Sequence, residues 1–204
     1  MTQKEAFRKL CKSKMQNKTN YFYKHQIHHT LFEMLKILQA TNILLYCPLK
    51  TEVDIFPLLY HLKKQKNYKI FIPKVTGISF DIVEFKLPLI KNKYGILESK
   101  TCAKNVKIDI AIIPVLGIDK DFRRIGFGKG MYDLFFAKLK KKPKIIFITK
   151  NLFFSKDKIT QDHDIQGDYL ISNFYRIKRI KNDNLFSHSL YSRLYGRNHR
   201  LFYF

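Results

Sequence analysis

The chain is poor in cysteine and contains no long apolar run. Its 204 residues include only 3 cysteines. Cys11, Cys47 and Cys102 show no CxxC or Cys/His ligand spacing, which argues against a disulfide framework and against a structural zinc site. No segment approaches the roughly 18 apolar residues of a transmembrane helix, and the polar N-terminus has no signal-peptide core. We therefore expect a soluble, cytoplasmic protein.

Acidic residues are also scarce. Lys and Arg number 39 against 16 Asp and Glu, which gives a formal net charge of +23. A surface potential of this sign attracts polyanions such as nucleotides, polyglutamylated substrates and nucleic acids. Lysines occur in nearly every segment, as they also would if the source proteome were biased toward lysine. Charge alone therefore does not name a partner.

The hydrophobic pattern predicts a single α/β domain. The length and the hydrophobic fraction of 46% suit one well-buried core. Apolar spacing predicts two helices within residues 2–39, further helices at 53–64 and 132–139, and strands at 42–46, 68–72, 78–85, 108–113, 144–148 and 169–172. Such alternation indicates a three-layer, Rossmann-like, mostly parallel sheet with helices on both faces. Ligands in these folds bind at the carboxyl ends of the strands.

The composition changes near the C-terminus. Residues 1–175 form the predicted α/β domain, and residues 176–204 form a basic and aromatic extension. Aromatic and basic side chains together can bind nucleic acid, which is the main alternative function. No RNP, KH, zinc-finger or helix-turn-helix signature supports it. Packing on the domain or self-association is the more ordinary role for such a tail, and we expect a monomer whose main function is not nucleic-acid binding.

The most informative local pattern is the segment Arg124-Ile-Gly-Phe-Gly-Lys-Gly-Met-Tyr-Asp133. Its three alternating glycines let backbone N–H groups approach an anion, and the helix that follows adds the positive end of its dipole. The spacing is neither that of a Walker loop nor the dinucleotide GxGxxG pattern. Asp133 can cap the helix or hold a magnesium ion against phosphate oxygens. A purely structural glycine-rich connection is the alternative.

Other segments extend this pattern along the chain. They are Lys4-Glu-Ala-Phe-Arg8, Thr51-Glu-Val-Asp54, Ile113-Pro-Val-Leu-Gly-Ile-Asp119 and His163-Asp-Ile-Gln-Gly-Asp168. Together with the glycine segment they resemble the 5-formyltetrahydrofolate cyclo-ligase family, also called methenyltetrahydrofolate synthetases, over about residues 4–172. The resemblance implies a Rossmann-like fold similar to ribose isomerases and CoA transferases. It also implies ATP- and Mg²⁺-dependent conversion of 5-formyltetrahydrofolate to 5,10-methenyltetrahydrofolate.

This chemistry explains why a phosphate loop is needed. The oxygen of an N-formyl amide is a poor leaving group until the γ-phosphate of ATP is transferred to it. In the family's route N10 then attacks the formyl carbon, and loss of phosphate leaves the cyclic methenyl cation. The protein must chiefly align the reactants and neutralise charge, because phosphoryl transfer depends on both.

The resemblance also implies roles for particular residues. Arg124, Lys129 and Tyr132 are implied to be catalytic. ATP contacts are implied for Lys4, Arg8, Arg124, Gly126, Phe127, Gly128, Lys129, Gly130 and Tyr132. Contacts with the reduced folate are implied for Arg8, Cys47, Glu52, Phe127, Gly128, Lys129, Gly130 and Met131. Asp133 and Asp164 are implied to hold magnesium.

Each of these roles has a structural alternative. Lys4 on a basic N-terminal helix can simply face solvent. Packing is the better explanation for Cys47, and Tyr132 suits a helix-start core position equally well. Aspartates near residue 164 usually form turns, and Asp119 can brace the loop arginines.

The chain departs from the family motifs at several positions. Val115, Ile118, Ser99, Met131 and Phe153 stand where other residues are usual. Most of these changes affect the expected folate-facing wall, whereas the phosphate loop is largely intact. Another ATP-using ligase or kinase, or a repurposed relative, therefore remains an alternative use of the same loop.

Overall fold

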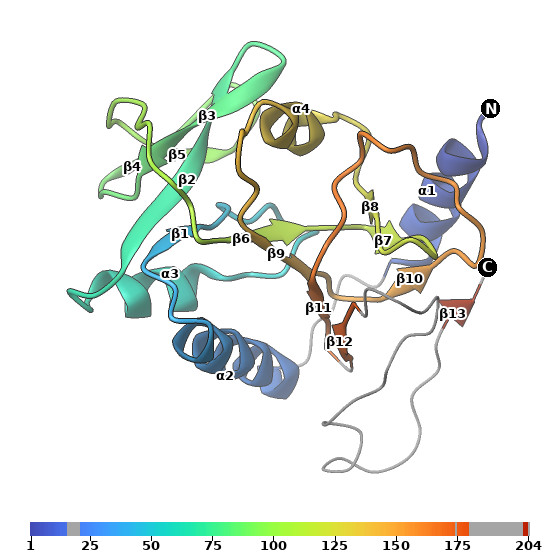
Figure 1. The fold of residues 1–204 in the computed structure, drawn as a ribbon, viewed down its shortest axis with the longest axis horizontal. Coiled ribbons are helices and arrows are strands. Elements are labelled where there is room, and N and C mark those ends of the chain that lie inside the picture. Colours follow the sequence, from blue (N-terminus) through green and yellow to red (C-terminus); the bar gives the residue numbers. More distant parts are fainter. Residues whose placement is uncertain (16–20, 174, 180–201, 204) are drawn as a thin grey trace.

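The computed structural model describes residues 1–15, 21–173, 175–179 and 202–203 (Figure 1). Its helices are α1 (Gln3–Lys14), α2 (Tyr21–Ile37), α3 (Phe56–Lys63) and α4 (Met131–Ala137). Its strands are β1 (Asn42–Leu44), β2 (Lys69–Thr76), β3 (Ser79–Glu84), β4 (Leu89–Lys91), β5 (Leu97–Ser99), β6 (Ile110–Pro114), β7 (Gly117–Ile118), β8 (Arg124–Ile125), β9 (Lys144–Ile148), β10 (Phe153–Phe154), β11 (Tyr169–Ile171), β12 (Arg176–Lys178) and β13 (Phe202–Tyr203).

A seven-stranded sheet forms the centre of the molecule. Its strand order is β12-β11-β9-β6-β1-β2-β3. The five strands from β11 to β2 run parallel, while β3 and β12 are antiparallel edge strands. The predicted α/β class with a mostly parallel sheet is therefore confirmed. None of the described helices is long and apolar enough to span a bilayer.

Both faces of this sheet are covered, as its apolar strands require. In β6, Ile110 and Ile112 belong to the core beneath α2 and α3, whereas Ala111 and Ile113 belong to the core beneath α4. Figure 1 shows α2 and α3 on one side of the sheet and α4 on the other. A strand buried on both faces reads as one continuous apolar run, which is why β6 and β9 are recognisable in the sequence.

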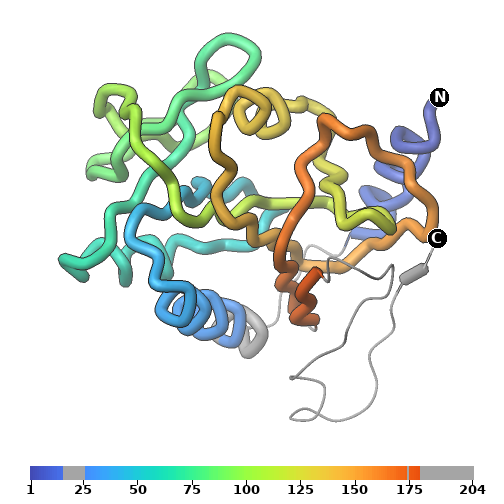
Figure 2. Tube along the Cα trace, viewed as in Figure 1, coloured from blue at the N-terminus to red at the C-terminus, as the bar shows by residue number. Residues whose placement is uncertain are grey.

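A smaller sheet and α1 flank the carboxyl ends of the main strands. The smaller sheet has the order β13-β10-β7-β8. Phe7 and Cys11 of α1 pack against Ile125 and Phe153 of this sheet. The side chain of Thr2 accepts a hydrogen bond from the Glu5 N–H, and the Glu5 carboxylate accepts one from the Thr2 N–H. These two bonds form a capping box at the start of α1. This packing brings the N-terminal helix beside the segment that contains the glycines (Figure 2).

Two elements have boundaries that differ from the sequence prediction. Strand β2 continues through Pro73 to Thr76 instead of ending at the proline. The missing N–H of Pro73 faces the side on which β1 has already ended, so no ladder hydrogen bond is lost. Helix α3 starts at Phe56 and not at residue 53, because the Asp54 carboxylate accepts the Phe56 N–H and holds a turn before it.

The sequence prediction also missed short strands. The hairpin of β4 and β5 was not predicted, and neither were the two-residue strands of the smaller sheet. The extension predicted from residue 176 begins with β12, which pairs with β11 as an edge strand of the main sheet. Most of the remainder of that extension lies outside the described residues, so its role stays a prediction.

Candidate active site

The site residues gather where the order of the sheet reverses. From β1 the chain passes to β2 on one side, and then returns to β6 on the other side of β1. Loops that leave β1 and β6 therefore diverge at their carboxyl ends, which is where ligands bind in open α/β sheets. A small hollow that opens to solvent lies there. It is lined by Met15, Thr51, Glu52, Val53, Pro114, Val115, Phe127, Ile148, Thr149, Lys150, Asn151 and Phe153.

The glycine loop, residues 124–133, forms one border of this region. Gly128 and Gly130 have φ angles of +116° and +63°, which side chains rarely adopt. Gly126 is needed for a different reason, because a Cβ atom there would lie 2.5 Å from the guanidinium nitrogens of Arg124. Two positions of the loop therefore favour glycine for backbone conformation, and at Gly126 a side chain would have to displace the guanidinium of Arg124.

Arg124 folds back inside the loop. It is only 7% exposed, and its Nε donates a 3.3 Å hydrogen bond to the Pro114 carbonyl. One of its terminal nitrogens lies 3.1 Å from the Asp133 carboxylate, and the guanidinium lies 5.0 Å from the ring centre of Tyr132. Arg124 thus braces the loop, and its predicted contact with phosphate stays a prediction.

Helix α1 presents three cations to the loop and to the neighbouring segment. Lys4 contacts both carboxylate oxygens of Asp164, at 2.5 and 2.6 Å. Arg8 donates to the Gly126 carbonyl at 2.9 Å, and Lys12 reaches the Phe127 carbonyl at 3.4 Å. The four-residue spacing places all three on one face of the helix. The structure thus brings Arg8 to the glycine loop and Lys4 to Asp164, rather than leaving these two residues in solvent.

The two predicted magnesium ligands lie near each other but already have partners. Asp133 binds Arg124 through one carboxylate oxygen, and its other oxygen accepts the Ile165 N–H at 3.2 Å. Asp164, next to Ile165, is 4% exposed. Its carboxylate accepts hydrogen bonds from the Lys4 ammonium and from the Gln161 N–H. Within the described residues, no group of three or more His, Cys, Asp or Glu side chains could hold a metal ion alone.

Glu52 supplies a carboxylate within the hollow. Its Oε2 accepts the Leu49 N–H at 2.9 Å. Burial raises the pKa of Glu52 above its usual value, while the Leu49 hydrogen bond and the positive charges of Arg124 and Lys150 oppose this increase. Burial raises the pKa values of Cys47 and Tyr132, and the negative charge of Glu52 adds to both increases. The sequence-predicted Glu52 therefore lies in the hollow.

Other predicted residues take different positions. Lys129 is exposed, and its ammonium lies 5.0 Å from the ring centre of Tyr94 in the turn between β4 and β5. Tyr132 is half-buried, and burial followed by Glu52 raises its pKa, so the hydroxyl stays protonated at neutral pH. Burial also raises the pKa of Cys47 to about 12, so it packs as a thiol in the core. Met131 packs against the core beneath α4.

Three residues near the site were missed by the sequence analysis. Lys12 continues the spacing of Lys4 and Arg8, and that spacing could have identified it. Lys150 and Asn151 line the hollow directly after β9, where no motif marks them. The amide nitrogen of Asn151 is buried and has no hydrogen-bond partner among the described residues, so a bound ligand could accept from it.

Asp119 braces the segment between β7 and β8 through backbone N–H groups and Thr160, whereas the sequence analysis expected it to brace the loop arginines through their side chains. It is fully buried, and its carboxylate accepts the Asp121 and Arg123 N–H groups at 3.1 Å each. It also accepts the N–H and the hydroxyl of Thr160. These bonds fix the start of the glycine loop against the chain before Asp164.

Comparisons with known proteins agree with this geometry. The model of the 5-formyltetrahydrofolate cyclo-ligase family matches residues 3–161. A 5-formyltetrahydrofolate cyclo-ligase of Mycoplasma pneumoniae is 30% identical over 132 residues, which are 65% of this chain and 73% of that protein. One from Haemophilus influenzae is 31% identical over 104 residues, which are 47% and 55% of the two chains.

Solved structures show the same fold. The NMR structure of Aquifex aeolicus 5,10-methenyltetrahydrofolate synthetase matches with a TM-score of 0.72 at 24% identity, covering 88% of this chain and 94% of that one. The 5,10-methenyltetrahydrofolate synthetase of Mycoplasma pneumoniae matches with a TM-score of 0.61 at 26% identity, covering 83% and 98%. Because the family model spans most of the sequence, the chain belongs to the 5-formyltetrahydrofolate cyclo-ligase family.

Proposed function

We propose that the protein converts 5-formyltetrahydrofolate and ATP to 5,10-methenyltetrahydrofolate, ADP and phosphate in the presence of Mg²⁺. One observation carries the proposal. The glycine loop, the cationic face of α1 and a hollow containing Glu52 meet at the carboxyl ends of β1, β6 and β9. Family membership gives this arrangement its chemical meaning.

The glycine loop and α1 suit the triphosphate. Lys4, Arg8 and Lys129, together with the N–H groups of residues 126–130, supply positive charge and donors around one region. Transfer of the γ-phosphoryl group to the formyl oxygen needs such alignment and neutralisation. Helix α4 has only seven residues, so we assign the main attraction to the side-chain cations and loop amides and not to the helix dipole.

Asp133 and Asp164 fit Mg²⁺ as a pair of carboxylates completed by phosphate oxygens and water. Magnesium in nucleotide sites usually takes one or two protein carboxylates and supplies charge neutralisation for the phosphates. Asp133 has a side chain that is 13% exposed and so is the more accessible. Asp164 can join only if Lys4 turns from it toward the phosphates, which gives Lys4 two successive partners.

The hollow suits the reduced folate. The ionised Glu52 carboxylate can accept hydrogen bonds from the N–H donors of the pterin, while Phe127 and Phe153 line the apolar wall. The Tyr132 hydroxyl stays protonated and is available to orient the formyl group. Attack of N10 on the formyl carbon then closes the ring, N10 loses its proton, and phosphate departs with the formyl oxygen to leave the methenyl cation. We further infer a cytoplasmic monomer, which a native mass measurement would test for oligomeric state.

The test is turnover of 5-formyltetrahydrofolate, followed by absorbance in the methenyl band. We expect product only with ATP and Mg²⁺ together, and equal amounts of ADP and methenyl product. Glu52→Ala should lose at least about 100-fold in kcat/KM, because the donors of the pterin lose a charged acceptor. Glu33→Gln on the exposed part of α2 is the matched control and should keep full activity. No turnover by a folded wild-type protein would reject the assignment.

A second test addresses the phosphate loop. Lys129→Ala should weaken ATP binding about tenfold, because a cation at the phosphates is lost. Thermal stability should stay unchanged, because the Lys129 ammonium is exposed and lies over the ring of Tyr94. Calorimetric titration with a non-hydrolysable ATP analogue measures the change. Equal affinity of the variant and the wild type would remove Lys129 from the ATP site.

A further inference from the structure

Lys150 connects two walls of the hollow. Its ammonium donates a 2.9 Å hydrogen bond to the backbone carbonyl of Lys50, a residue 100 positions earlier in the chain. Lys150 follows β9 and Lys50 follows β1, and β6 lies between these two strands in the sheet. The side chain therefore crosses the carboxyl end of β6, a gap of roughly 10 Å from strand to strand. Because β1 and β9 are not neighbours in the sheet, Lys150 connects two loops whose strands do not pair with each other.

The Lys50 carbonyl belongs to the turn that presents Glu52. The Glu52 N–H donates to the Leu49 carbonyl at 3.0 Å, and the Leu49 N–H donates to the Glu52 carboxylate at 2.9 Å. These two bonds close a small ring of backbone and side chain with Lys50 inside it. Fixing the Lys50 carbonyl consequently fixes the frame on which the Glu52 carboxylate is aimed into the hollow.

The ammonium also supplies charge where Glu52 needs it. Burial raises the pKa of Glu52, and Lys150 and Arg124 are the two cations that lower it. Arg124 is shared, because it also pairs with Asp133. The other ionisable groups facing Glu52 are Tyr46, Cys47 and Tyr132, whose raised pKa values keep them neutral.

We propose that Lys150 is a positioning residue for folate recognition, which holds the turn bearing Glu52 and provides the countercharge for its carboxylate. The inference rests on the proposed function, in which Glu52 accepts hydrogen bonds from the pterin. Lys150 acts through Glu52, so its removal changes the affinity for the folate and leaves the triphosphate site at the other border of the hollow intact.

The dependence on pH follows from the sign of the charge effect. Only the ionised Glu52 is a full acceptor for the pterin donors, and it is lost as pH falls through the pKa of Glu52. Without Lys150 one of the two opposing cations is gone, so that pKa rises further. The variant should therefore lose folate affinity at a higher pH than the wild type does.

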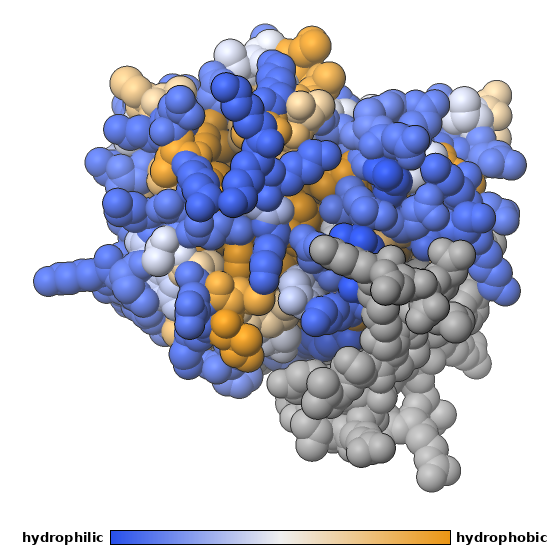
Figure 3. Space-filling view, viewed as in Figure 1, coloured by the Kyte–Doolittle hydropathy of each residue, from blue (hydrophilic) through white to orange (hydrophobic). Residues whose placement is uncertain are grey.

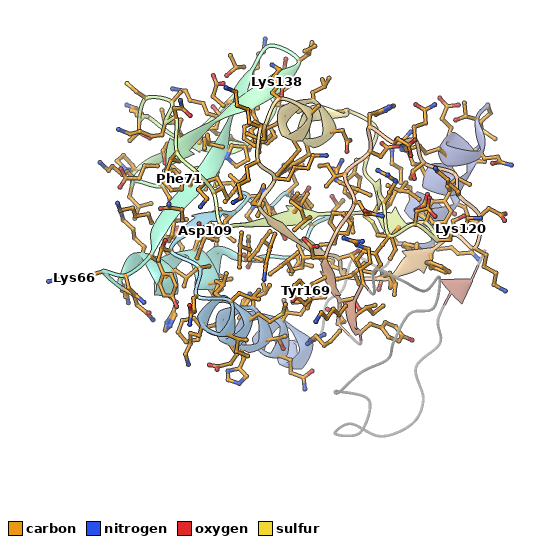
Figure 4. All side chains as sticks on the ribbon, in the orientation of Figure 1. Lys66, Phe71, Asp109, Lys120, Lys138 and Tyr169 are labelled. Carbon is orange, nitrogen blue, oxygen red and sulfur yellow. The ribbon has the colours of Figure 1, made fainter. Side chains whose placement is uncertain are left out.

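The experiment compares Lys150→Met and Lys150→Arg with Lys120→Met as the matched control. Lys120 is an exposed lysine that is labelled in Figure 4 and lies in the segment after β7, away from the residues of the hollow. For Lys150→Met we expect the KM for 5-formyltetrahydrofolate to rise about tenfold at neutral pH and more in mild acid. The KM for ATP should stay within about twofold, and arginine should restore most of the loss.

Other outcomes would overturn the inference. If both KM values rise together, if the loss is the same at every pH, or if arginine performs no better than methionine, then Lys150 serves only the general structure. A titration of ¹³C-labelled glutamate side chains, with Glu52 assigned by Glu52→Gln, reads the pKa without turnover. A midpoint for Glu52 that is unchanged in Lys150→Met would reject the charge effect even if the wild type lacked cyclo-ligase activity.

Discussion

At the scale of single residues, Glu52 illustrates a conflict between stability and function. Its folded-state pKa lies above its usual value, chiefly because the carboxyl group is buried. The stability that this group contributes is fully present below its unfolded pKa and is lost as pH rises through the folded pKa. Once it is ionised, the carboxylate is therefore a cost to the fold, which its predicted use in substrate binding explains.

Glu52→Gln should consequently stabilise the protein in a pH-dependent manner. Glutamine keeps an oxygen that can accept the Leu49 N–H and removes the buried charge. We expect the melting temperature to rise by about 2–4 °C at pH 8, the effect of ~1 kcal/mol in a chain of this size, and by less near pH 5. Differential scanning calorimetry at both pH values measures it. Glu33→Gln, where Lys36 lowers the pKa, should show no such increase.

Gly126 offers a second residue-scale prediction, because the sign of the effect identifies its cause. The φ angle of Gly126 is not in the left-handed region. Without a steric clash, alanine at this position should therefore stabilise the protein by about 0.4–1 kcal/mol, because it lowers the conformational entropy of the unfolded chain. The close approach of Arg124 should reverse this, and we expect Gly126→Ala to destabilise by about 1–3 kcal/mol. Urea unfolding measures the difference. In an Arg124→Ala background the same substitution should become neutral or stabilising, and a persistent loss there would contradict the steric explanation.

At the scale of elements, the sequence predicts buried strands better than it predicts marginal ones. Strand β9 was predicted at residues 144–148, as observed, because both of its faces are buried and its apolar run is unbroken. The hairpin of β4 and β5 was missed since its strands are three residues each and mostly exposed or half-buried. Pro73 misled the prediction because its effect depends on which neighbour its nitrogen faces.

The residues of the candidate site also differ in how well the sequence predicts them. The glycine loop and Glu52 could be predicted from motifs, as each has a local pattern. Lys150 could not, because its importance comes from a hydrogen bond across the sheet that no local pattern encodes. The pairing of Asp164 with Lys4 was not predicted either, although both residues had been singled out. Sequence patterns thus pointed to residues that have a local motif, whereas Lys150 and the pairing of Lys4 with Asp164 depend on tertiary structure.

The attachment of α1 provides a prediction at this scale. Lys4 and Asp164 have side chains that are 17% and 4% exposed, so removing the cation leaves a buried carboxylate without its partner. Lys4→Met should therefore destabilise the protein by about 2–3 kcal/mol, measured by urea unfolding at neutral pH. Lys9→Met, at an exposed position of the same helix, should change stability by less than about 0.5 kcal/mol.

The second substitution of a cycle distinguishes the ion pair from packing. In an Asp164→Asn background, Lys4→Met should cost much less, since the neutral amide does not need a cation. If the cost is the same in both backgrounds, then the ion pair does not attach α1. The apolar contacts of Phe7 and Cys11 would in that case account for the docking.

At the scale of the whole molecule, the positive charge is distributed unevenly between the two ends of the sheet. The segments that precede β2, β6 and β9, residues 63–69, 104–109 and 138–144, contain eleven lysines and one carboxylate, Asp109. The segments at the carboxyl ends, residues 49–55, 115–130 and 149–158, contain eight basic and five acidic residues. Figure 4 labels Lys66 and Asp109 toward one end of the molecule and Lys120 at the other.

This asymmetry has a structural origin in the parallel sheet. The amino ends of β2, β1, β6 and β9 lie along one edge, so the lysines of three separate segments are brought together there. Asp109 is the one carboxylate among these lysines, and it accepts the N–H groups of Thr41 and Asn42. In the space-filling view, hydrophilic and hydrophobic residues are interspersed on the side where Figure 1 places the starts of β1 and β6 (Figure 3).

The lysines of residues 63–69, 104–109 and 138–144, here called the lysine edge, can contact nucleic acid. Since lysines provide point charges without a base-reading motif, we expect weak and sequence-independent binding of single-stranded RNA whose affinity falls steeply with salt. Replacing the five lysines of residues 138–144 by glutamine should reduce the slope of log K against log salt, while folate turnover stays unchanged because the active site lies at the opposite end of the strands. Fluorescence anisotropy across a salt series measures the slope. Tight RNA binding that persists at about 0.2 M salt would contradict this expectation, and so would a loss of turnover together with RNA binding. Either result would show that this edge has a dedicated partner and that its charge is more than a consequence of lysine-rich composition.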